Sequence, residues 1–175
     1  IYSKDIKHES QVSLSPDSDW DQLIQQANLG KVGAIIHFDT NPVYHFPKDL
    51  GYLDAIKKVP CIVTLTESEN ETSIRGHYTV PIHHNIESWG DAKPRTGVMS
   101  LIQPMISTLL NTRQKEAILL YWTGQAVSQF NEDDYHQYLR QNWEKNVFPT
   151  LDLKVDFKSF WMAALHDGVI ALKEK

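Results

Sequence analysis

Two apolar runs of strand length, residues 32–38 and 59–65, constrain the fold of this chain most strongly. A segment with helical spacing, restarted by Pro47 and Asp49, separates them. Strands that are joined through a helix pair in parallel, and the crossover between them is right-handed. A shorter run, Tyr78–Ile82, follows a polar loop and contains a proline, which favours an edge strand. These runs predict a parallel sheet.

Helical patterns occupy both ends of the chain, outside the alternating region. Pro16 and Gly30 bound a first helix, after a polar and aperiodic segment over residues 1–15. Residues 85–111 are rich in Gly, Pro, Ser and Asn and lack a sustained period, so we expect a long loop with a functional or docking role. Three further helices are predicted, over 112–122, from the cap Asn131 to Pro149, and from the cap Asp156 to the stop Gly168.

Together these patterns predict an α/β domain of three layers, Rossmann-like, with a mainly parallel sheet, helices on both faces and extra C-terminal helices. We expect the α/β domain to cover residues 1–125 and a helical extension over residues 126–175 to pack on the same domain. Because the chain begins at Ile1 and not at Met, we also expect it to be part of a longer protein.

Charge and cysteine content exclude several classes of function. The net charge is −5, and no Lys/Arg cluster exceeds a pair, so we expect no nucleic-acid partner and no binding to an anionic membrane surface. No apolar run approaches the roughly 18 residues of a membrane span, so we expect no direct membrane insertion. The single cysteine, Cys61, excludes an intrachain disulfide and a four-cysteine iron–sulfur cluster within these residues, and we expect it to be buried and inert.

Polar loops follow each predicted strand. They are Asp39–Pro42, Asn70–Thr72 and Glu87–Asp91. Open α/β sheets bind ligands at the carboxyl ends of their strands, so we expect these three loops to share one rim.

The order of these features resembles the molybdopterin oxidoreductase family. That family reads strand, Asn-Pro loop, helix, strand, Glu-Thr loop, and a strand closing in Leu-Pro before an acidic, Gly-containing turn. The resemblance covers about residues 20–172 and is strongest to the molybdopterin-like iron–sulfur subunit of alternative complex III, a quinol:cytochrome c oxidoreductase. Its residues here are His84–Asp91 (HNIESWGD), Ser100–Pro104 (SLIQP) and Asn111–Arg113 (NTR). Where the family has Ala-Asp and then Leu-Pro, this chain has Gly76, His77 and then Val80, Pro81.

The resemblance implies a pterin-dinucleotide-binding type of domain, with Asn41, Pro42, Glu71 and Thr72 at the cofactor-binding positions. The cofactor would be molybdopterin guanine dinucleotide if the family site is retained; within these residues alone we expect no cofactor. The residues also have a purely structural interpretation, since Asn and Pro form turns and Glu71 can cap the turn from Asn70. No Gly-rich phosphate loop of the G-x-G-x-x-G kind is present.

Other polar clusters carry weaker hypotheses. His83, His84, Glu87 and Asp91 are of types that bind zinc or iron, but adjacent residues of a strand point to opposite faces, so we expect rim histidines in solvent and no metal site. Glu87 and Asp91 are more simply a salt-bridged turn than an acid/base pair. Trp89, Asp91 and Gln103 are the predicted interface residues, because a large aromatic side chain in a Gly/Asp-rich loop often anchors a protein contact.

The preferred functional hypothesis is a non-catalytic scaffold domain of a molybdopterin-oxidoreductase-like iron–sulfur subunit in a respiratory electron-transfer complex. Its partners would be other domains of the parent protein and subunits of a membrane-bound complex, with the chain in a peripheral subunit on a bacterial membrane. The alternative is the cofactor-binding domain of an active molybdopterin-dependent oxidoreductase whose catalytic residues lie elsewhere. A free-standing module that binds a small ligand or a partner is the third hypothesis.

Overall fold

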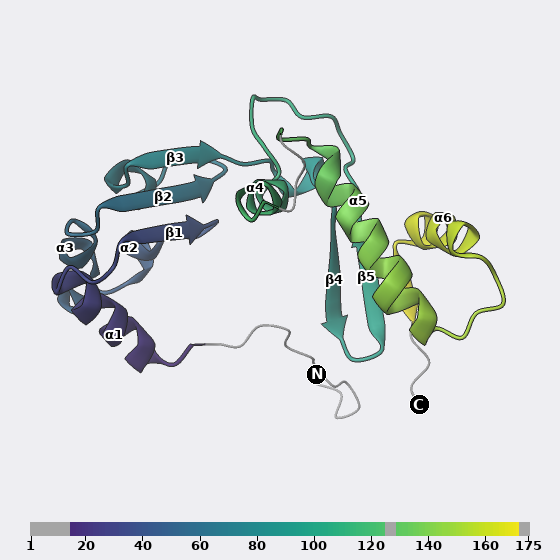
Figure 1. Cartoon of the computed structure of the whole chain (residues 1–175), viewed down its shortest axis with the longest axis horizontal. Helices are drawn as coiled ribbons and strands as arrows, with labels where there is room; N and C mark the ends of the chain where they lie inside the picture. Colours follow the sequence, from purple (N-terminus) through teal and green to yellow (C-terminus); the bar gives the residue numbers. More distant parts are fainter. Residues whose placement is uncertain (1–14, 125–128, 172–175) are drawn as a thin grey trace, which may run out of the picture. The chain divides into compact units, whose positions relative to one another are not determined.

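The computed structural model describes residues 15–124 and 129–171. The predicted boundary between residues 125 and 126, and nearly all of the predicted polar segment over residues 1–15, lie outside the described residues. Backbone contacts divide the described chain into two compact units. The parallel-sheet unit contains residues 15–83 and Leu110–Lys115, and the antiparallel-sheet unit contains His84–Leu109 and residues 116–124 and 129–171 (Figure 1).

The parallel-sheet unit has the predicted alternation of helices and strands. Its strands pair in parallel in the order β1-β2-β3, with β3 at an edge, as the proline in that strand predicts. Its elements are α1 (Asp17–Asn28), β1 (Ala34–Phe38), α2 (Pro42–His45), the 3-10 turn η1 (Lys48–Leu50), α3 (Tyr52–Ile56), β2 (Cys61–Thr66), the 3-10 turn η2 (Ser73–Arg75) and β3 (Tyr78–Pro81). The α/β class is therefore confirmed.

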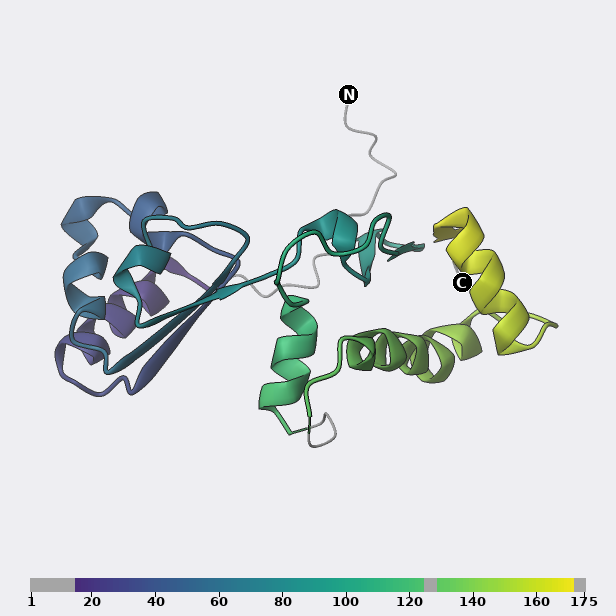
Figure 2. The ribbon, with the colours of Figure 1, turned by 90° about the horizontal axis from the view of Figure 1, so that it is seen from above.

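Helices α1 and α3 cover one face of this sheet (Figure 2). Ile35 and Ile62 are paired in register on that face and pack in a core with Ala27, Tyr52, Ala55, Ile56 and Val59. The opposite face carries Ile36 and Tyr78, which lie in one row across Val63 and are 50% and 63% exposed. A Rossmann-like arrangement with helices on both faces is not confirmed.

The connection between β1 and β2 contains three short helical segments, α2, η1 and α3, where the sequence predicts one helix. Pro42 does not merely end the strand; it occupies the first turn of α2, where its missing N–H costs nothing. The predicted helix from Pro47 through Ile56 is wrong in its first half, because Gly51 adopts φ +73° and separates η1 from α3. Glycine takes this left-handed conformation without the steric penalty of a side chain.

The antiparallel-sheet unit contains a hairpin where the sequence predicts a long loop. Strands β4 (Gly90–Arg95) and β5 (Val98–Ile102) pair antiparallel, and β6 (Val169–Ala171) adds to β5. The prediction of a loop over residues 85–111 is therefore wrong. A register shift between Ala92 and Arg95, together with Pro94, interrupts the alternation of side chains that identifies a strand.

Helices complete this unit. They are α4 (Lys115–Trp122), α5 (Asp133–Asn142) and α6 (Phe157–Asp167), with the 3-10 turns η3 (Asn85–Glu87) and η5 (Phe148–Thr150) and the π-helical turn η4 (Trp143–Val147). Both predicted ends of α6 are confirmed: the Ser159 amide donates to Asp156 Oδ1 at 3.0 Å, and Gly168 ends the helix at φ +69°. The core consists of Leu101, Leu139, Trp143, Val147, Phe160, Trp161 and Ala164.

Candidate functional site

The loops after β1 and β2 meet at the carboxyl end of the parallel sheet, and Asn41 joins them. Its amide Nδ2 donates to Glu71 Oε2 at 2.7 Å, and its Oδ1 accepts from the Thr72 hydroxyl at 2.7 Å and the Thr72 amide at 3.2 Å. The Thr72 hydroxyl, which is fully buried, also accepts from the Val43 amide at 3.0 Å. We call Asn41, Glu71 and Thr72 the loop clasp. The sequence prediction that these residues lie at one rim is correct for these two loops.

The second loop has its own internal support. Asn70 Oδ1 accepts from the amides of Thr72 and Ser73, at 3.0 and 2.9 Å. Its Nδ2 donates to Thr66 Oγ1 at 3.0 Å. The turn is therefore capped by Asn70, and the Glu71 carboxylate is left for Asn41.

The hydrogen bond from Asn41 lowers the pKa of the Glu71 carboxyl, with a smaller contribution from the backbone of Glu71 itself. A carboxyl whose pKa is lower in the folded state contributes stability above its unfolded pKa of about 4.3, and that contribution is lost as the pH falls through the folded value. We expect the Glu71 side-chain carboxyl signal in a carbon-13 NMR titration to move at a higher pH in Asn41→Ala than in the unmodified chain. An unchanged titration midpoint would show that the Asn41–Glu71 hydrogen bond does not stabilise the ionised carboxylate in solution.

The chain's own Leu110–Lys115 segment also reaches the carboxyl end of the sheet. The Lys115 ammonium pairs with Asp39 Oδ2 at 2.6 Å, beyond the end of β1. Ile82 and Arg113 form a parallel bridge after β3, and the His83 amide donates to the Arg113 carbonyl at 3.0 Å. Asn111–Arg113, one of the stretches that carry the family resemblance, thus extends the sheet edge.

The third predicted loop, Glu87–Asp91, belongs to the antiparallel-sheet unit, so only two loops are joined in one unit. His83 remains in the parallel-sheet unit, where it is 7% exposed and its Nδ1 lies 2.6 Å from the Thr112 hydroxyl. The prediction of a solvated rim histidine is wrong for this residue and correct for the exposed His84. Thr112, distant in sequence, is a partner of this buried histidine.

The four residues considered as metal ligands have other contacts. His84 Nδ1 accepts from the Ile86 amide at 3.2 Å, and the Glu87 carboxylate accepts from the amides of His84 and Leu109 at 3.1 and 2.9 Å. Across residues 15–124 and 129–171, no group of three or more His, Cys, Asp or Glu side chains is arranged to hold a metal ion.

The three predicted interface residues also make contacts inside their unit. Trp89 stacks on His136 with ring centroids 4.0 Å apart and planes 12° from parallel. Asp91 Oδ2 accepts from the indole N–H of the buried Trp143 at 2.7 Å, and Gln103 Nε2 donates to the Leu165 carbonyl at 3.0 Å. These contacts join the start of β4 to α5 and η4, and the end of β5 to α6.

A buried polar chain in the parallel-sheet unit was not predicted. His37 Nε2 lies 2.7 Å from the Tyr52 hydroxyl, and His37 Nδ1 lies 3.2 Å from the Thr64 hydroxyl. All three residues are less than 5% exposed. The available signal was a histidine inside the apolar run 32–38, at a position where a buried ring needs partners. Cys61, expected to be buried, is only partly so.

A comparison with known proteins finds a similar sequence in a subunit of a redox enzyme. Over 98 residues, or 54% of this chain, the sequence is 26% identical to the menaquinone reductase, molybdopterin-binding-like subunit, of Nitratidesulfovibrio vulgaris (strain Hildenborough), of which the match spans 14%. No protein-family model matches the chain. Within the described residues no helix has the length and apolar character to cross a bilayer. The similarity supports a molybdopterin-oxidoreductase-like family, without specifying a particular complex.

Proposed function

We propose that this chain is a non-catalytic scaffold domain of a molybdopterin-oxidoreductase-like iron–sulfur subunit in a respiratory electron-transfer complex, peripheral to a bacterial membrane. The main support is the loop clasp. The side-chain amide of Asn41 donates to Glu71 and its carbonyl oxygen accepts from Thr72, so the groups expected to bind a cofactor bind each other. A hydrogen-bonding group that already has its partners gains little by exchanging them for a ligand.

The surroundings of the clasp support the same proposal. Lys115 pairs with Asp39 just beyond β1, which neutralises a cation that a phosphate would otherwise attract. No Gly-rich phosphate loop is present in the sequence. The name of the similar subunit, molybdopterin-binding-like in a menaquinone reductase, agrees with a redox-complex role. Its partners here would be other domains of a parent protein and further subunits of that complex.

Scaffold contacts would be made by the segment over residues 85–111, which includes the predicted interface residues. Met105 and Leu109 in this segment are 82% and 77% exposed, and Ile86 beside them is 43% exposed. The segment is nevertheless held in place, because the Met105 amide donates to the Ile86 carbonyl at 2.8 Å. Exposed apolar side chains on a fixed backbone are typical of a surface that is covered in an assembly.

Titration of the chain with molybdopterin guanine dinucleotide, followed by isothermal calorimetry, tests the scaffold role. We expect no saturable binding, and we expect the amide NMR signals of Val43 and Thr72 to stay in place. Tight binding with one site per chain, abolished in Thr72→Val, would overturn the proposal. That result would support the alternative, a cofactor-binding domain of an active oxidoreductase in which Asn41, Pro42, Glu71 and Thr72 hold the cofactor. Molybdenum or tungsten in the purified parent protein would favour the same alternative.

A further inference from the structure

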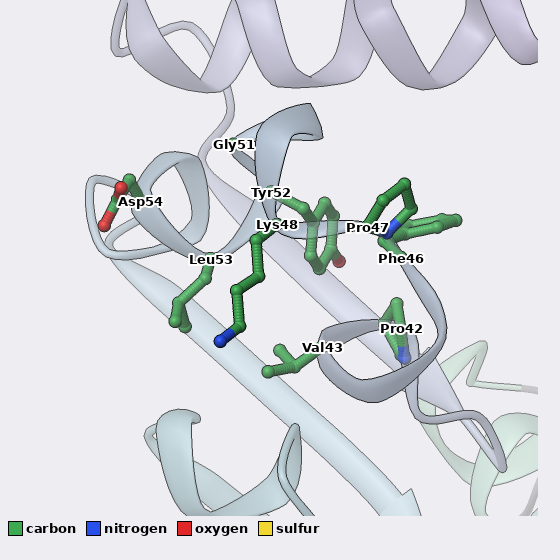
Figure 3. Close-up of a pocket in the computed structure, with 9 residues that line it drawn as sticks. All are labelled: Pro42, Val43, Phe46, Pro47, Lys48, Gly51, Tyr52, Leu53 and Asp54. Atoms are coloured by element: carbon green, nitrogen blue, oxygen red, sulfur yellow. The ribbon is translucent and has the colours of Figure 1, made fainter.

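A pocket of about 320 Å³ lies between α2 and α3 in the parallel-sheet unit (Figure 3). Its lining is largely apolar and aromatic: Pro42, Val43, Phe46, Pro47, Lys48, Gly51, Tyr52, Leu53 and Asp54. Small-molecule sites range from roughly 300 to 1,000 Å³, so a pocket of this size suits a compound with a single ring. No residue of the loop clasp lines it, although Pro42, a candidate cofactor-binding residue, does.

The aromatic wall of the pocket is fixed from behind. The rings of Phe46 and Tyr52 meet edge to face, with centroids 5.2 Å apart, and Trp20 packs against Phe46 at 4.7 Å. The Tyr52 hydroxyl is tied to His37 Nε2 at 2.7 Å, and His37 is tied in turn to Thr64. A wall that is already ordered reduces the entropy lost when a ligand binds.

This wall carries no charge near neutral pH. Burial lowers the pKa of His37, which keeps its imidazole neutral, and raises the pKa of Tyr52 to about 12, which keeps its hydroxyl protonated. The rings of Phe46 and Tyr52 therefore line the pocket as an uncharged aromatic wall. A ligand ring can make edge-to-face or offset contacts with these two rings.

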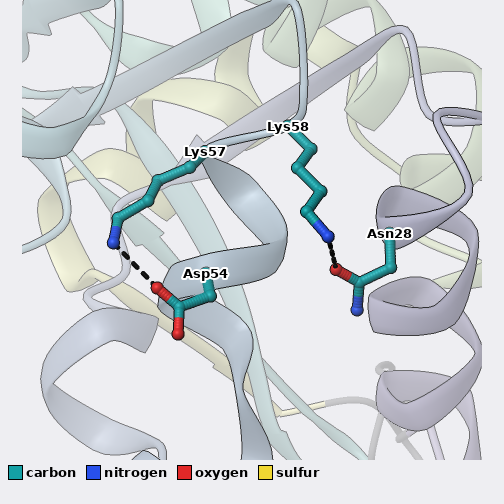
Figure 4. Close-up of polar contacts among 4 residues, drawn as sticks. All are labelled: Asn28, Asp54, Lys57 and Lys58. Atoms are coloured by element: carbon teal, nitrogen blue, oxygen red, sulfur yellow. Dashed lines mark hydrogen bonds and ion pairs between the residues drawn. The ribbon is translucent and has the colours of Figure 1, made fainter.

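The charged residues of the lining are not equivalent. Asp54 Oδ1 is paired with Lys57 at 2.7 Å, and the neighbouring Lys58 donates to Asn28 Oδ1 at 2.9 Å (Figure 4). The Lys48 side chain, in contrast, makes no hydrogen bond or ion pair with any residue in the described ranges. Its side chain extends across the pocket, and its ammonium lies beside Val43 and Leu53 (Figure 3). The pocket thus combines an apolar aromatic wall with an uncompensated positive charge.

We propose that this pocket binds a one-ring aromatic carboxylate, with the ring on Phe46 and Tyr52 and the carboxylate accepting hydrogen bonds from the Lys48 ammonium. A carboxylate matches the cation in charge, and a single ring suits the size and the apolar lining of the pocket. Gly51, at φ +73°, turns the chain between η1, which carries Lys48, and α3, which carries Tyr52 and Leu53. The site adjoins the loop clasp, because Val43 lines the pocket and also donates its amide to the Thr72 hydroxyl, but none of the three clasp residues lines it.

Benzoate is the probe that tests this site, with methyl NMR of Val43 and Leu53 as the readout. We expect saturable shifts of both residues' methyl signals, weaker binding of the uncharged benzamide, and weaker binding of the non-aromatic cyclohexanecarboxylate. Removing the cation with Lys48→Met should weaken benzoate binding by roughly fivefold, the factor for an ion pair at a partly exposed site. Lys48→Arg should retain most of the affinity because it keeps the charge.

Lys58→Met is the matched control. It removes the same charge from an exposed lysine two residues beyond α3 that does not line the pocket, so benzoate affinity should be unchanged. The proposal is overturned if the methyl signals do not respond to benzoate, if benzamide binds as tightly as benzoate, or if the two Lys→Met variants lose affinity equally. Lys48 and Lys58 are both exposed, and an unchanged far-UV circular dichroism spectrum of each Lys→Met variant confirms that its fold is intact.

Discussion

Replacing Trp143 by Ala should lower the free energy of unfolding of the antiparallel-sheet unit by about 3–5 kcal/mol, the cost of removing a large aromatic side chain from a packed core. Trp143 has no exposed surface; its ring stacks with Phe160 at a centroid distance of 6.3 Å and meets Trp161 edge to face at 6.0 Å. Urea denaturation followed by far-UV circular dichroism measures the loss. Trp122→Ala is the control: this tryptophan is 44% exposed on α4 and its removal should cost much less.

Trp143→Phe separates the two roles of the indole. The ring volume is largely kept, but Asp91 Oδ2 loses the donor that lies at 2.7 Å. Leaving a partly buried acceptor without its partner costs roughly 1–3 kcal/mol. The prediction fails if Trp143→Ala destabilises the chain no more than Trp122→Ala does.

Asn41→Leu should destabilise the parallel-sheet unit by about 2–3 kcal/mol, because three hydrogen bonds are lost and the buried Thr72 hydroxyl keeps no acceptor. Leucine has nearly the same shape as asparagine, so the loss reports on polarity. Native-state hydrogen exchange should show faster exchange at the Val43 and Thr72 amides, which lie on opposite sides of the clasp. The effect of this substitution also bears on function.

Asn146→Leu is the control for that experiment. Asn146 donates to Asn142 Oδ1 at 2.7 Å on an exposed surface, and such a surface change should stay within about 0.5 kcal/mol. If Asn41→Leu is equally mild, the clasp contributes little to stability, and Asn41 is free to serve a ligand instead. That outcome would favour the cofactor-binding alternative over the scaffold.

Local signals explain what the sequence predicts well. The strands β1 and β2 were recognisable because each is a short apolar run bounded by Gly, Pro or polar residues, and the parallel pairing followed from the helical segment between them. Helix α6 was recognisable at both ends from Asp156 and Gly168, which act within one turn of the chain. Residues close in sequence determine these features.

Contacts between distant residues account for what was missed. The Lys115–Asp39 ion pair joins residues from different parts of the chain, and no local pattern indicates it. The β4–β5 hairpin was hidden because its bulge and Pro94 disturb the alternation of side chains. Asn41, Glu71 and Thr72 were singled out for a ligand; their close approach was expected, but their hydrogen bonding to each other depends on side-chain geometry that the sequence does not specify.

The chain passes from the parallel-sheet unit to the antiparallel-sheet unit and back, which limits where it can be cut into two pieces. The parallel-sheet unit takes its last residues, Leu110–Lys115, only after the chain has passed through residues 84–109. A truncation after His83 would remove both the bridge from Arg113 to Ile82 and the partner of Asp39. The N-terminal piece of a gene cut at that point encodes β1, β2 and β3 without their native edge, whereas the C-terminal piece encodes β4, β5 and β6 together, so the parallel-sheet unit is complete only when both pieces are expressed together.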